Sequence, residues 1–424
     1  MVELDFEVYK NVIGGQLKGG TENYHGINPF TEEKLWPAPI ATEEDLEEAV
    51  KAASLAFQTW QHTSVEERRR RVNDFSDALG AQKDIWVPII SKETATLDLP
   101  EYTTQDDEEV KVTTKYYPLG VVGAICPWNF PVFLAAGRIA SAVSTGNTII
   151  IKPSPFTPYT ILKLVELAQH FFPAGVIQAL GGNDDLGPWM TTHPGITKIT
   201  FTGSSATGKK VMAAPAPTLK RVTLELHAGQ TCIAAKRIYV QASIYDEFMK
   251  KFTEECKKLI PGKLDLSPIQ NKLQYEKVKS LFADCQNQGY EFALGGPDFK
   301  QEIPGYFIPA AIVDNPPEQS HVVQDEPFGP IAPVLKWEDE EEVIQCANGT
   351  DQGLGATLWC RNTEQAERIA LRLEAGSVWV NRGVVPLPTA LFGGIKQSGL
   401  GGEWGQLGLL NYCSARTFHF AKNF

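Results

Sequence analysis

The chain has 424 residues, which is too long for one hydrophobic core and predicts two or three domains. Its 51 acidic residues outnumber its 39 basic residues and give a formal net charge of -12, which argues against nucleic acid and anionic membrane surfaces as partners. The seven cysteines form no CxxC pair and no Cys/His group at metal-ligand spacing, so we expect neither a disulfide framework nor a metal site.

The first residues carry acids early and show no basic stretch followed by an apolar run, so no secretory leader is predicted. No segment approaches the roughly 18 uninterrupted apolar residues that a membrane-spanning helix needs. Together with the dispersed cysteines, which are typical of a reducing compartment, these features predict a cytoplasmic protein.

Two helices are predicted between residues 42 and 90. Thr42 and Asp45 have capping-box spacing before one apolar helical stripe, and Ser64 and Glu67 have the same spacing before a second. The arginine run at 68–71 lies on the second helix, where a solvated helix face explains it better than a nucleic acid patch.

The segment 108–117 then alternates like a strand or hairpin arm. From residue 121 to 226, short β-branched runs alternate with helices of about ten to fifteen residues. The runs are VVGAIC, NTIIIKP, VIQAL, ITKITFTGS and RVTLEL. This rhythm predicts βαβ units on a parallel sheet with both faces covered, and ligands on such sheets bind at the carboxyl ends of the strands.

After Cys232 the same rhythm resumes and predicts a second α/β unit. Its predicted strands are KRIYVQ, APVLKW, GATLWC and GSVWVN. The tail CSARTFHF predicts a terminal strand, which we expect to pair with the arm at 110–117 of the same or a neighbouring subunit.

Residues capable of chemistry follow several of these strands. Asn129 lies in the loop CPWNFP, Lys152 ends the strand of IIIKPSP, and Glu225 lies in VTLEL. Gly203 and Ser204 open a helix whose free N-H groups and dipole suit a pyrophosphate, although glycine also opens helices for steric reasons. Lys152 alone is equally compatible with a surface lysine whose stem covers apolar surface.

Cys232 differs from the other six cysteines, which we expect to be small core residues, because it follows the loop motif Gly-Gln-Thr. A free thiol has a pKa of about 8.5, so a nucleophile at neutral pH needs that pKa lowered by a helix N-terminus or a nearby cation. His227 lies close in sequence, which keeps a thiol ester hydrolase open as an alternative.

Taken in order, seven segments resemble the aldehyde dehydrogenase superfamily along nearly the whole chain. They are PWNFP, IIIKPSPFTP, FTGSSATGK, VTLEL, GQTC, DEPFGP and FGGIKQSGLGGEWG. The resemblance implies an α/β fold with two Rossmann-like open-sheet domains, one cofactor-binding and one catalytic, plus a small β-arm for oligomerisation. The implied boundaries are 1–107 and 119–226 for the cofactor-binding domain, with 393–411 packing back on it, 227–392 for the catalytic domain, and 108–118 with 412–424 for the arm.

The resemblance also implies roles for single residues. Cys232 would attack the aldehyde carbonyl, Asn129 and the Cys232 backbone N-H would hold the oxyanion, and Glu225 would activate the water that hydrolyses the thioester. The implied cofactor is NAD, and NADP stays open because Pro155 stands where many NAD-using members have a glutamate. The implied cofactor-binding residues are Lys152, Ser154, Gly203, Ser204, Glu326, Phe328 and Trp128, of which Lys152 and Glu326 would contact the riboses and Ser204 the pyrophosphate.

The chain departs from this family between Glu225 and Cys232. Family members carry a strand and a helix there, whereas here HAGQTC follows directly, as if both elements had been excised. Another long helix is missing near residue 96. Seven extended residues span at most about 25 Å, so the short link can still bring Glu225 and Cys232 together. These trims are compatible with a minimised enzyme, a degenerate paralogue or a gene model that lost exon sequence.

Three functions therefore stay open for this chain. The leading hypothesis is NAD(P)-dependent oxidation of a small-molecule aldehyde to its carboxylic acid through Cys232. The alternatives are a protein that binds nucleotide or partners without turnover, and a residual thiol ester hydrolase. The arm and the terminal strand favour a homodimer or homotetramer.

Overall fold

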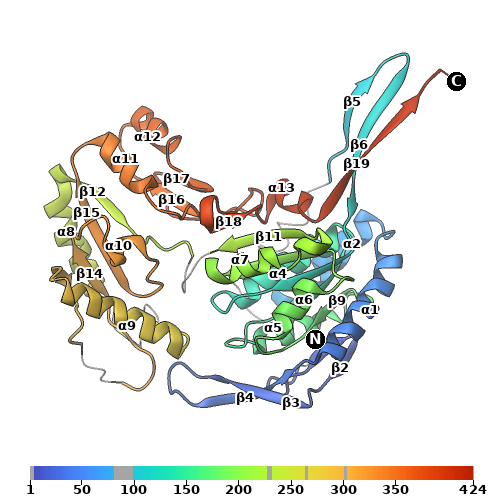
Figure 1. Cartoon of the computed structure of the whole chain (residues 1–424), viewed down its shortest axis with the longest axis horizontal. Helices are drawn as coiled ribbons and strands as arrows, with labels where there is room; N and C mark the ends of the chain where they lie inside the picture. Colours follow the sequence, from blue (N-terminus) through green and yellow to red (C-terminus); the bar gives the residue numbers. More distant parts are fainter. Residues whose placement is uncertain (1–3, 81–98, 227–231, 263–265, 300–302, 424) are drawn as a thin grey trace.

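The structure is a computed structural model, and it describes residues 4–80, 99–226, 232–262, 266–299 and 303–423. Two α/β units lie side by side, and a β-arm projects from the first of them (Figure 1). The predicted α/β class with two open-sheet units is confirmed, because parallel strands form the centre of both units. Within the described ranges, no helix is both long enough and apolar enough to cross a bilayer.

The first unit is built on an eight-stranded sheet in the order β18-β11-β10-β7-β8-β9-β1-β2. The five strands from β11 to β9 are parallel, whereas β18 and β1 add to the edges in antiparallel orientation. The bounds are β1 Asn11–Ile13, β2 Gln16–Lys18, β7 Val121–Ile125, β8 Thr148–Lys152, β9 Ile177–Ala179, β10 Lys198–Gly203, β11 Arg221–Leu226 and β18 Gly399–Leu400.

Helices cover both faces of this sheet, as the runs of buried β-branched residues predicted. Along β7, Val122 and Ala124 pack with α2, α4 and α5 on one face, and Val121 and Ile125 pack with α1, α6 and α7 on the other. The bounds are α1 Glu43–Trp60, α2 Val65–Gly80, α4 Pro131–Ser144, α5 Tyr159–Ala168, α6 Leu186–Thr192 and α7 Ser205–Ala213, with a short 3-10 turn η1 at Ala216–Thr218. The predicted capping box of the first helix is present, since Thr42 and Asp45 bond each other's backbone N-H.

The second unit contains two separate sheets. Strands β12 (Ile238–Gln241), β15 (Ile331–Trp337), β14 (Ala311–Asp314) and β13 (Phe292–Leu294) form one of them in that order. Strands β16 (Gly355–Leu358) and β17 (Ser377–Val380) form the other. The helices are α8 Ala242–Cys256, α9 Lys272–Asn287, α10 His321–Gln324, α11 Glu340–Asn348 and α12 Thr363–Ala370. A single open sheet was expected here, and its division into two is consistent with the loss of a strand after Glu225.

The arm is a three-stranded antiparallel sheet. Strand β19 (Cys413–Ala421) pairs along its whole length with β6 (Val110–Pro118), so the terminal strand pairs within its own chain. Strand β5 (Tyr102–Asp106) covers the other edge of β6, so the arm sheet starts before residue 108. It extends away from both units in Figure 1, which leaves the outer edges of β5 and β19 without a neighbour among the described residues.

An antiparallel ribbon, which was not predicted from the sequence, links the two units. Strands β3 (Glu22–Ile27) and β4 (Lys34–Ile40) run beneath both units in Figure 1. At one end the Tyr159 hydroxyl donates to the carbonyl of Trp36 at 2.7 Å. At the other end the backbone N-H of Tyr306 donates to the carbonyl of Pro29 at 2.9 Å. Strand β4 contains two prolines, which hides it from a search for strand residues.

The segment after residue 392 returns to the first unit. Strand β18 pairs with β11 beside Glu225, after a short 3-10 turn η2 at Lys396–Ser398. Helix α13 (Gly405–Leu410) then packs near α4 and leads into β19. This return places residues 399–404 at the edge of the sheet that carries Glu225.

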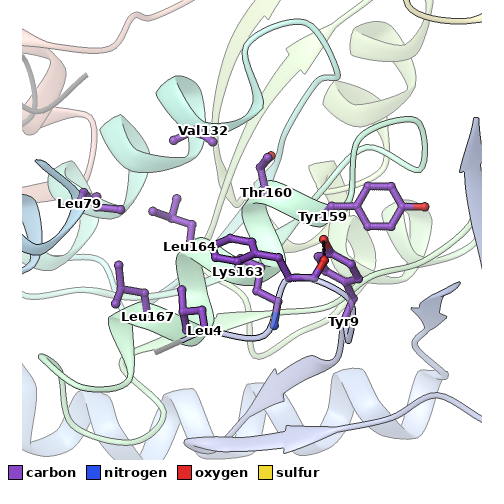
Figure 2. A pocket seen from close by; sticks show the side chains of 10 residues that line it. Leu4, Tyr9, Leu79, Val132, Tyr159, Thr160, Lys163, Leu164 and Leu167 are labelled. Atoms are coloured by element: carbon purple, nitrogen blue, oxygen red, sulfur yellow. Dashed lines mark hydrogen bonds between the residues drawn. The ribbon is translucent and has the colours of Figure 1, made fainter. Parts of the chain in front are cut away.

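An apolar pocket of about 180 Å³ lies between the N-terminal segment and helix α5 of the first unit (Figure 2). Tyr9 from the N-terminal segment and Lys163 from α5 line it, and the Lys163 ammonium lies 5.3 Å from the centre of the Tyr9 ring. Its lining includes none of the predicted site residues, which lie instead at the carboxyl ends of the strands and in the loop at 326–328.

Candidate active site

The order of the central strands marks a crevice. Strands β7, β8 and β9 follow one another in one direction across the sheet, and β10 and β11 continue on the other side of β7. The order therefore reverses between β7 and β10, and ligands of open α/β sheets bind beyond the carboxyl ends of strands at such a point. The register pairs Ile125 with Lys152 and Thr202 with Glu225, so the predicted post-strand residues meet at this edge.

Asn129 lies in the loop between β7 and α4, and α4 begins at Pro131. Its amide nitrogen and oxygen are both buried, and neither has a hydrogen-bond partner among the described residues. A buried polar group left in this way costs about 1–3 kcal/mol, so it requires an explanation. A ligand oxygen that accepts from the amide nitrogen would supply the missing partner.

Glu225 lies in β11 with 5% of its surface exposed. Burial raises the pKa of its carboxyl to about 7, while the nearby Arg138 guanidinium opposes that rise and Glu403 adds to it. The Thr202 hydroxyl donates to the Glu225 carboxylate at 3.4 Å. A carboxyl with a pKa near neutrality exchanges protons readily at physiological pH, which is the property required of a general base.

Cys232 is the first described residue after the short link and is partly buried. Burial raises the pKa of its thiol, and the carboxylates of Glu225 and Glu326 raise it further. Both carboxylates therefore act on the same thiol, as the short link between Glu225 and Cys232 permits. A nucleophile at neutral pH needs the opposite shift of its pKa, and a cation bound beside the thiol would supply it. His227 and the rest of the link lie outside the described residues.

A buried cluster behind Glu225 was missed by the sequence analysis. Arg138 of α4 is 2% exposed and donates to the carbonyl of Ile125 at 3.1 Å, to the Cys126 thiol at 3.4 Å and to the Thr202 hydroxyl. Its Nε lies 3.8 Å from the carboxylate of Glu403. An arginine inside the otherwise apolar helix 131–144 was the available signal, because a buried charge needs a partner.

Glu403 completes this cluster from the returning segment. Its carboxylate accepts from the Thr200 hydroxyl at 2.6 Å and from the Tyr412 hydroxyl at 2.9 Å. Two backbone hydrogen bonds to Phe392, of 2.8 and 2.9 Å, hold its main chain. These contacts fix the corner at residues 403–404 against the sheet that carries Glu225.

Aromatic side chains pack beside Cys232. Phe392 and Trp404 form the buried centre of this group, and Phe133 from α4 and Trp379 from β17 pack against them. The Trp404 ring lies 5.2 Å from Phe392 in a stacked arrangement and 5.3 Å from Phe133 in an edge arrangement. Phe133 lies near the start of α4, in the same segment as Asn129.

The predicted cofactor residues form a connected edge. Lys152 is 6% exposed, and burial lowers the pKa of its ammonium to about 8. Its Nζ donates to the carbonyl of Pro153 at 3.5 Å, which leaves donor capacity for a ligand hydroxyl. Ser154 is buried two residues later. Ser204 caps α7 and accepts from the Thr207 backbone N-H at 3.3 Å, and a Cβ on Gly203 would come within 2.5 Å of the Phe201 ring.

The remaining predicted residues approach from the second unit. Phe328 has a φ of 54°, and its ring lies 6.1 Å from that of Trp128 in an edge arrangement. The Lys277 ammonium donates to the backbone carbonyl of Glu326 at 3.0 Å and so helps to hold this loop. Phe328 thus meets the loop that carries Trp128 and Asn129, and the charge of Glu326 acts on the Cys232 thiol. The hydrogen-bond donors and apolar side chains of this edge suit a dinucleotide.

Comparisons with known proteins agree with this arrangement. The family model described as "Aldehyde dehydrogenase family" matches residues 17–99, 93–228 and 226–418. The putative aldehyde dehydrogenase FUS7 of Gibberella moniliformis is 39% identical and covers 99% of this chain and 100% of its own. The putative aldehyde dehydrogenase DhaS of Bacillus subtilis is 34% identical over 92% of this chain and 90% of its own.

Solved structures show the same fold. An NAD+ complex of aldehyde dehydrogenase from Bacillus cereus gives a TM-score of 0.93 at 28% identity, covering 97% of this chain and 96% of that one. Betaine aldehyde dehydrogenase from Staphylococcus aureus in complex with NAD+ gives a TM-score of 0.92 at 27% identity, covering 98% and 95%.

The breaks in the family match fall at the departures found in the sequence. One lies at 93–99 and the other at 226–228, next to Glu225. The alignment with the Gibberella relative spans 467 positions, which is 43 more than the 424 residues of this chain. The chain therefore lacks segments that this relative has. The family model still matches it from residue 17 to residue 418, and relatives are up to 39% identical along its length. The chain belongs to the aldehyde dehydrogenase family.

Proposed function

We propose that this chain oxidises an aldehyde to a carboxylic acid with NAD or NADP, using Cys232, Glu225 and Asn129. The observation that carries the proposal is the convergence of three groups. The Cys232 thiol lies in the field of Glu225 and Glu326, and the unpartnered Asn129 amide lies in the loop that begins at the same sheet edge. Acyl transfer through a thioester needs such a nucleophile, a base and an oxyanion donor.

Cys232 Sγ would add to the carbonyl carbon of the aldehyde. The carbonyl oxygen would become an oxyanion, and the Asn129 amide nitrogen would donate to it, which satisfies a buried group that has no partner in the described part of the chain. A nicotinamide held by the proposed cofactor residues would supply a hydride acceptor and a positive charge. The carbonyl carbon would lose its hydride to that acceptor as the oxyanion collapses, which leaves an acyl group on Cys232 as a thioester.

Glu225 would then take a proton from water while that water attacks the thioester. The products are the carboxylic acid and the Cys232 thiol. A carboxyl with a pKa of about 7 is half ionised at neutral pH and can return its proton quickly. Thr202 and Arg138 support the ionised form, since the hydroxyl donates to it and the guanidinium lowers its pKa.

The cofactor proposal rests on the edge formed by Lys152, Ser154, Gly203 and Ser204, together with Trp128, Glu326 and Phe328. Lys152 and Glu326 would bind ribose hydroxyls, and the N-terminus of α7 at Ser204 would face the pyrophosphate. Pro155 neither binds nor repels a 2'-phosphate, so NADP is an alternative to NAD. We also propose the expected domain boundaries, with the arm extended to β5, and assembly into a homodimer or homotetramer through the arm.

The test is cofactor reduction by the purified wild type and by Cys232→Ala. Absorbance of the reduced cofactor is followed with a panel of aldehydes and with NAD or NADP. We expect turnover in the wild type and none in Cys232→Ala at an equal folded fraction, measured by circular dichroism. A well-folded wild type that binds NAD without reducing it would favour the binding protein instead, and hydrolysis of an ester without cofactor use would favour the thiol hydrolase.

A further inference from the structure

We propose that Asp184 makes this site prefer NAD to NADP, because its carboxylate lies where the 2'-phosphate of NADP would bind beside Lys152. The inference rests on the proposed function, because it concerns the cofactor of the same site. It goes further in choosing between the two cofactors and in assigning that choice to a residue outside the loop that follows β8.

Asp184 lies at the carboxyl edge of the sheet, next to the strand that ends at Lys152. Strands β8 and β9 are parallel neighbours, and the Leu180 backbone N-H donates to the carbonyl of Ile151 at 2.9 Å. The chain then leaves the sheet through residues 181–185, after which α6 begins. Asp184 and Lys152 therefore lie at the same edge, beyond which ligands of open α/β sheets bind.

The charge of Asp184 acts on the Lys152 ammonium. Lys152 is 6% exposed, and burial lowers the pKa of its ammonium to about 8, whereas the Asp184 carboxylate opposes that shift. An opposite charge has such an effect only when it is near. The Lys152 ammonium donates to the carbonyl of Pro153 at the long distance of 3.5 Å, so it keeps donors for a ligand. The two side chains are therefore close enough to bind one ligand from adjacent strands.

The adenosine ribose of NAD suits this pair of groups. Its hydroxyls donate to a carboxylate and accept from an ammonium, so Asp184 and Lys152 together satisfy both roles. In NADP a phosphate occupies the 2' position and carries about 1.5 to 2 negative charges at neutral pH. Lys152 alone would attract that phosphate, and the carboxylate of Asp184 cancels the attraction.

Asp184 also supplies a charge that the loop after β8 lacks. Lys152 is followed there by Pro153, Ser154 and Pro155, and none of these three side chains carries a charge. An acid that accepts from the ribose hydroxyls would therefore come from another strand, and the loop after β9 brings one. For this reason residues 152–155 by themselves do not distinguish NAD from NADP.

Asp185 is the matched control, since it is the next residue, carries the same charge and is also exposed. Its carboxylate accepts from the Asn183 side-chain amide at 3.0 Å, and its backbone N-H donates to the Asn183 side-chain oxygen at 3.0 Å. Asp185 thus pairs within its own loop, whereas the pull on the Lys152 ammonium comes from Asp184. A substitution of either aspartate removes one negative charge from the same loop.

The binding experiment uses ADP-ribose and 2'-phospho-ADP-ribose, which lack the nicotinamide and need no turnover. Their Kd values are measured by calorimetry in the wild type, Asp184→Asn, Asp184→Glu and Asp185→Asn. We expect the wild type to bind ADP-ribose about tenfold more tightly, and Asp184→Asn to lose most of that preference. Asp184→Glu and Asp185→Asn should keep it. The wild-type preference should also weaken at high salt, because Asp184 is exposed and its charge is screened.

The kinetic experiment compares kcat/KM for NAD with kcat/KM for NADP in the same variants. A loss of folded enzyme cancels in this ratio, which should fall about tenfold in Asp184→Asn and stay unchanged in Asp185→Asn.

The inference would be overturned by a wild type that prefers the 2'-phosphate or binds neither probe, by an unchanged preference in Asp184→Asn, or by an equal loss in Asp185→Asn. The expected Kd values without any aldehyde turnover would sink the dehydrogenase proposal and keep the role of Asp184. Turnover with the same cofactor ratio in wild type and Asp184→Asn would do the reverse.

Discussion

The substitution Glu225→Gln should remove activity and yet stabilise the protein at alkaline pH. The pKa of Glu225 rises from an ordinary value of 4.5 to about 7 because the carboxyl is buried. For an acid with a raised folded pKa, the unfolded chain ionises first, so stability falls as the pH rises from 4.5 towards 7. The loss in the free energy of unfolding is fully present above pH 7 and amounts to about 3 kcal/mol. Glutamine keeps the size of the side chain and carries no charge to bury.

The assay is thermal unfolding of wild type and Glu225→Gln between pH 5 and 8. At pH 8 we expect the variant to unfold about 5 °C higher, and we expect the difference to shrink as the pH approaches 5. Glu403→Gln is the matched control, since its buried carboxylate has Arg138, Thr200 and Tyr412 as partners and its loss should destabilise the fold. A lower midpoint for Glu225→Gln at pH 8, or a difference that does not change with pH, would refute the reasoning.

The same substitution tests the base. Activity of the wild type should rise with pH through about 7, as Glu225 ionises, and kcat of Glu225→Gln should fall by about 100-fold or more. An initial burst of reduced cofactor should survive in the variant, because Cys232 can still be acylated. The absence of a burst would place Glu225 in an earlier step.

Four other outcomes are expected. Asn129→Ala should lower kcat by about 100-fold or more. It should not lower the unfolding midpoint, because the Asn129 amide has no hydrogen-bond partner among the described residues to lose. A clear loss of stability in calorimetry would contradict that role. Lys152→Met should raise KM for NAD by about tenfold with a smaller effect on kcat. The wild-type KM for NAD should also rise above pH 8, because the Lys152 ammonium loses its proton there. An unchanged KM in the variant would remove Lys152 from the cofactor site. Arg138→Met should move the rise of activity to higher pH, because the guanidinium lowers the pKa of Glu225. Arg138→Lys keeps the positive charge and should keep most of the wild-type dependence of activity on pH. Identical pH profiles for both variants would argue against a charge effect. Removal of residues 413–424 should abolish assembly in analytical ultracentrifugation, since β6 loses its paired strand β19, and an unchanged oligomer would place the interface elsewhere.

The sequence by itself determined the layered α/β plan and the kinds of residue at the strand ends. Continuous apolar runs at 121–125 and 149–151 predicted strands buried on both faces, because a two-residue period sends neighbouring side chains to opposite sides and both sets are apolar here. Asn129 and Cys232 were predicted to take part in chemistry because each lies in a polar loop that interrupts an apolar pattern. The tail at 413–421 was also predicted, and pairing with β6 confirmed it.

Only the tertiary structure decided which of these side chains act on one another. The field of Glu326 at Cys232 comes from a segment about ninety residues away in sequence, and the pKa of Glu225, about 7, depends on burial and on the distant residues Arg138 and Glu403, so neither leaves a local pattern. The role of Arg138 depends on Glu403 in the same way. The strained backbone of Trp404 also depends on packing, because local propensity would not place a tryptophan in a glycine conformation. The division of the second unit into two sheets depends on which distant strands pair, and local strand propensity does not determine that.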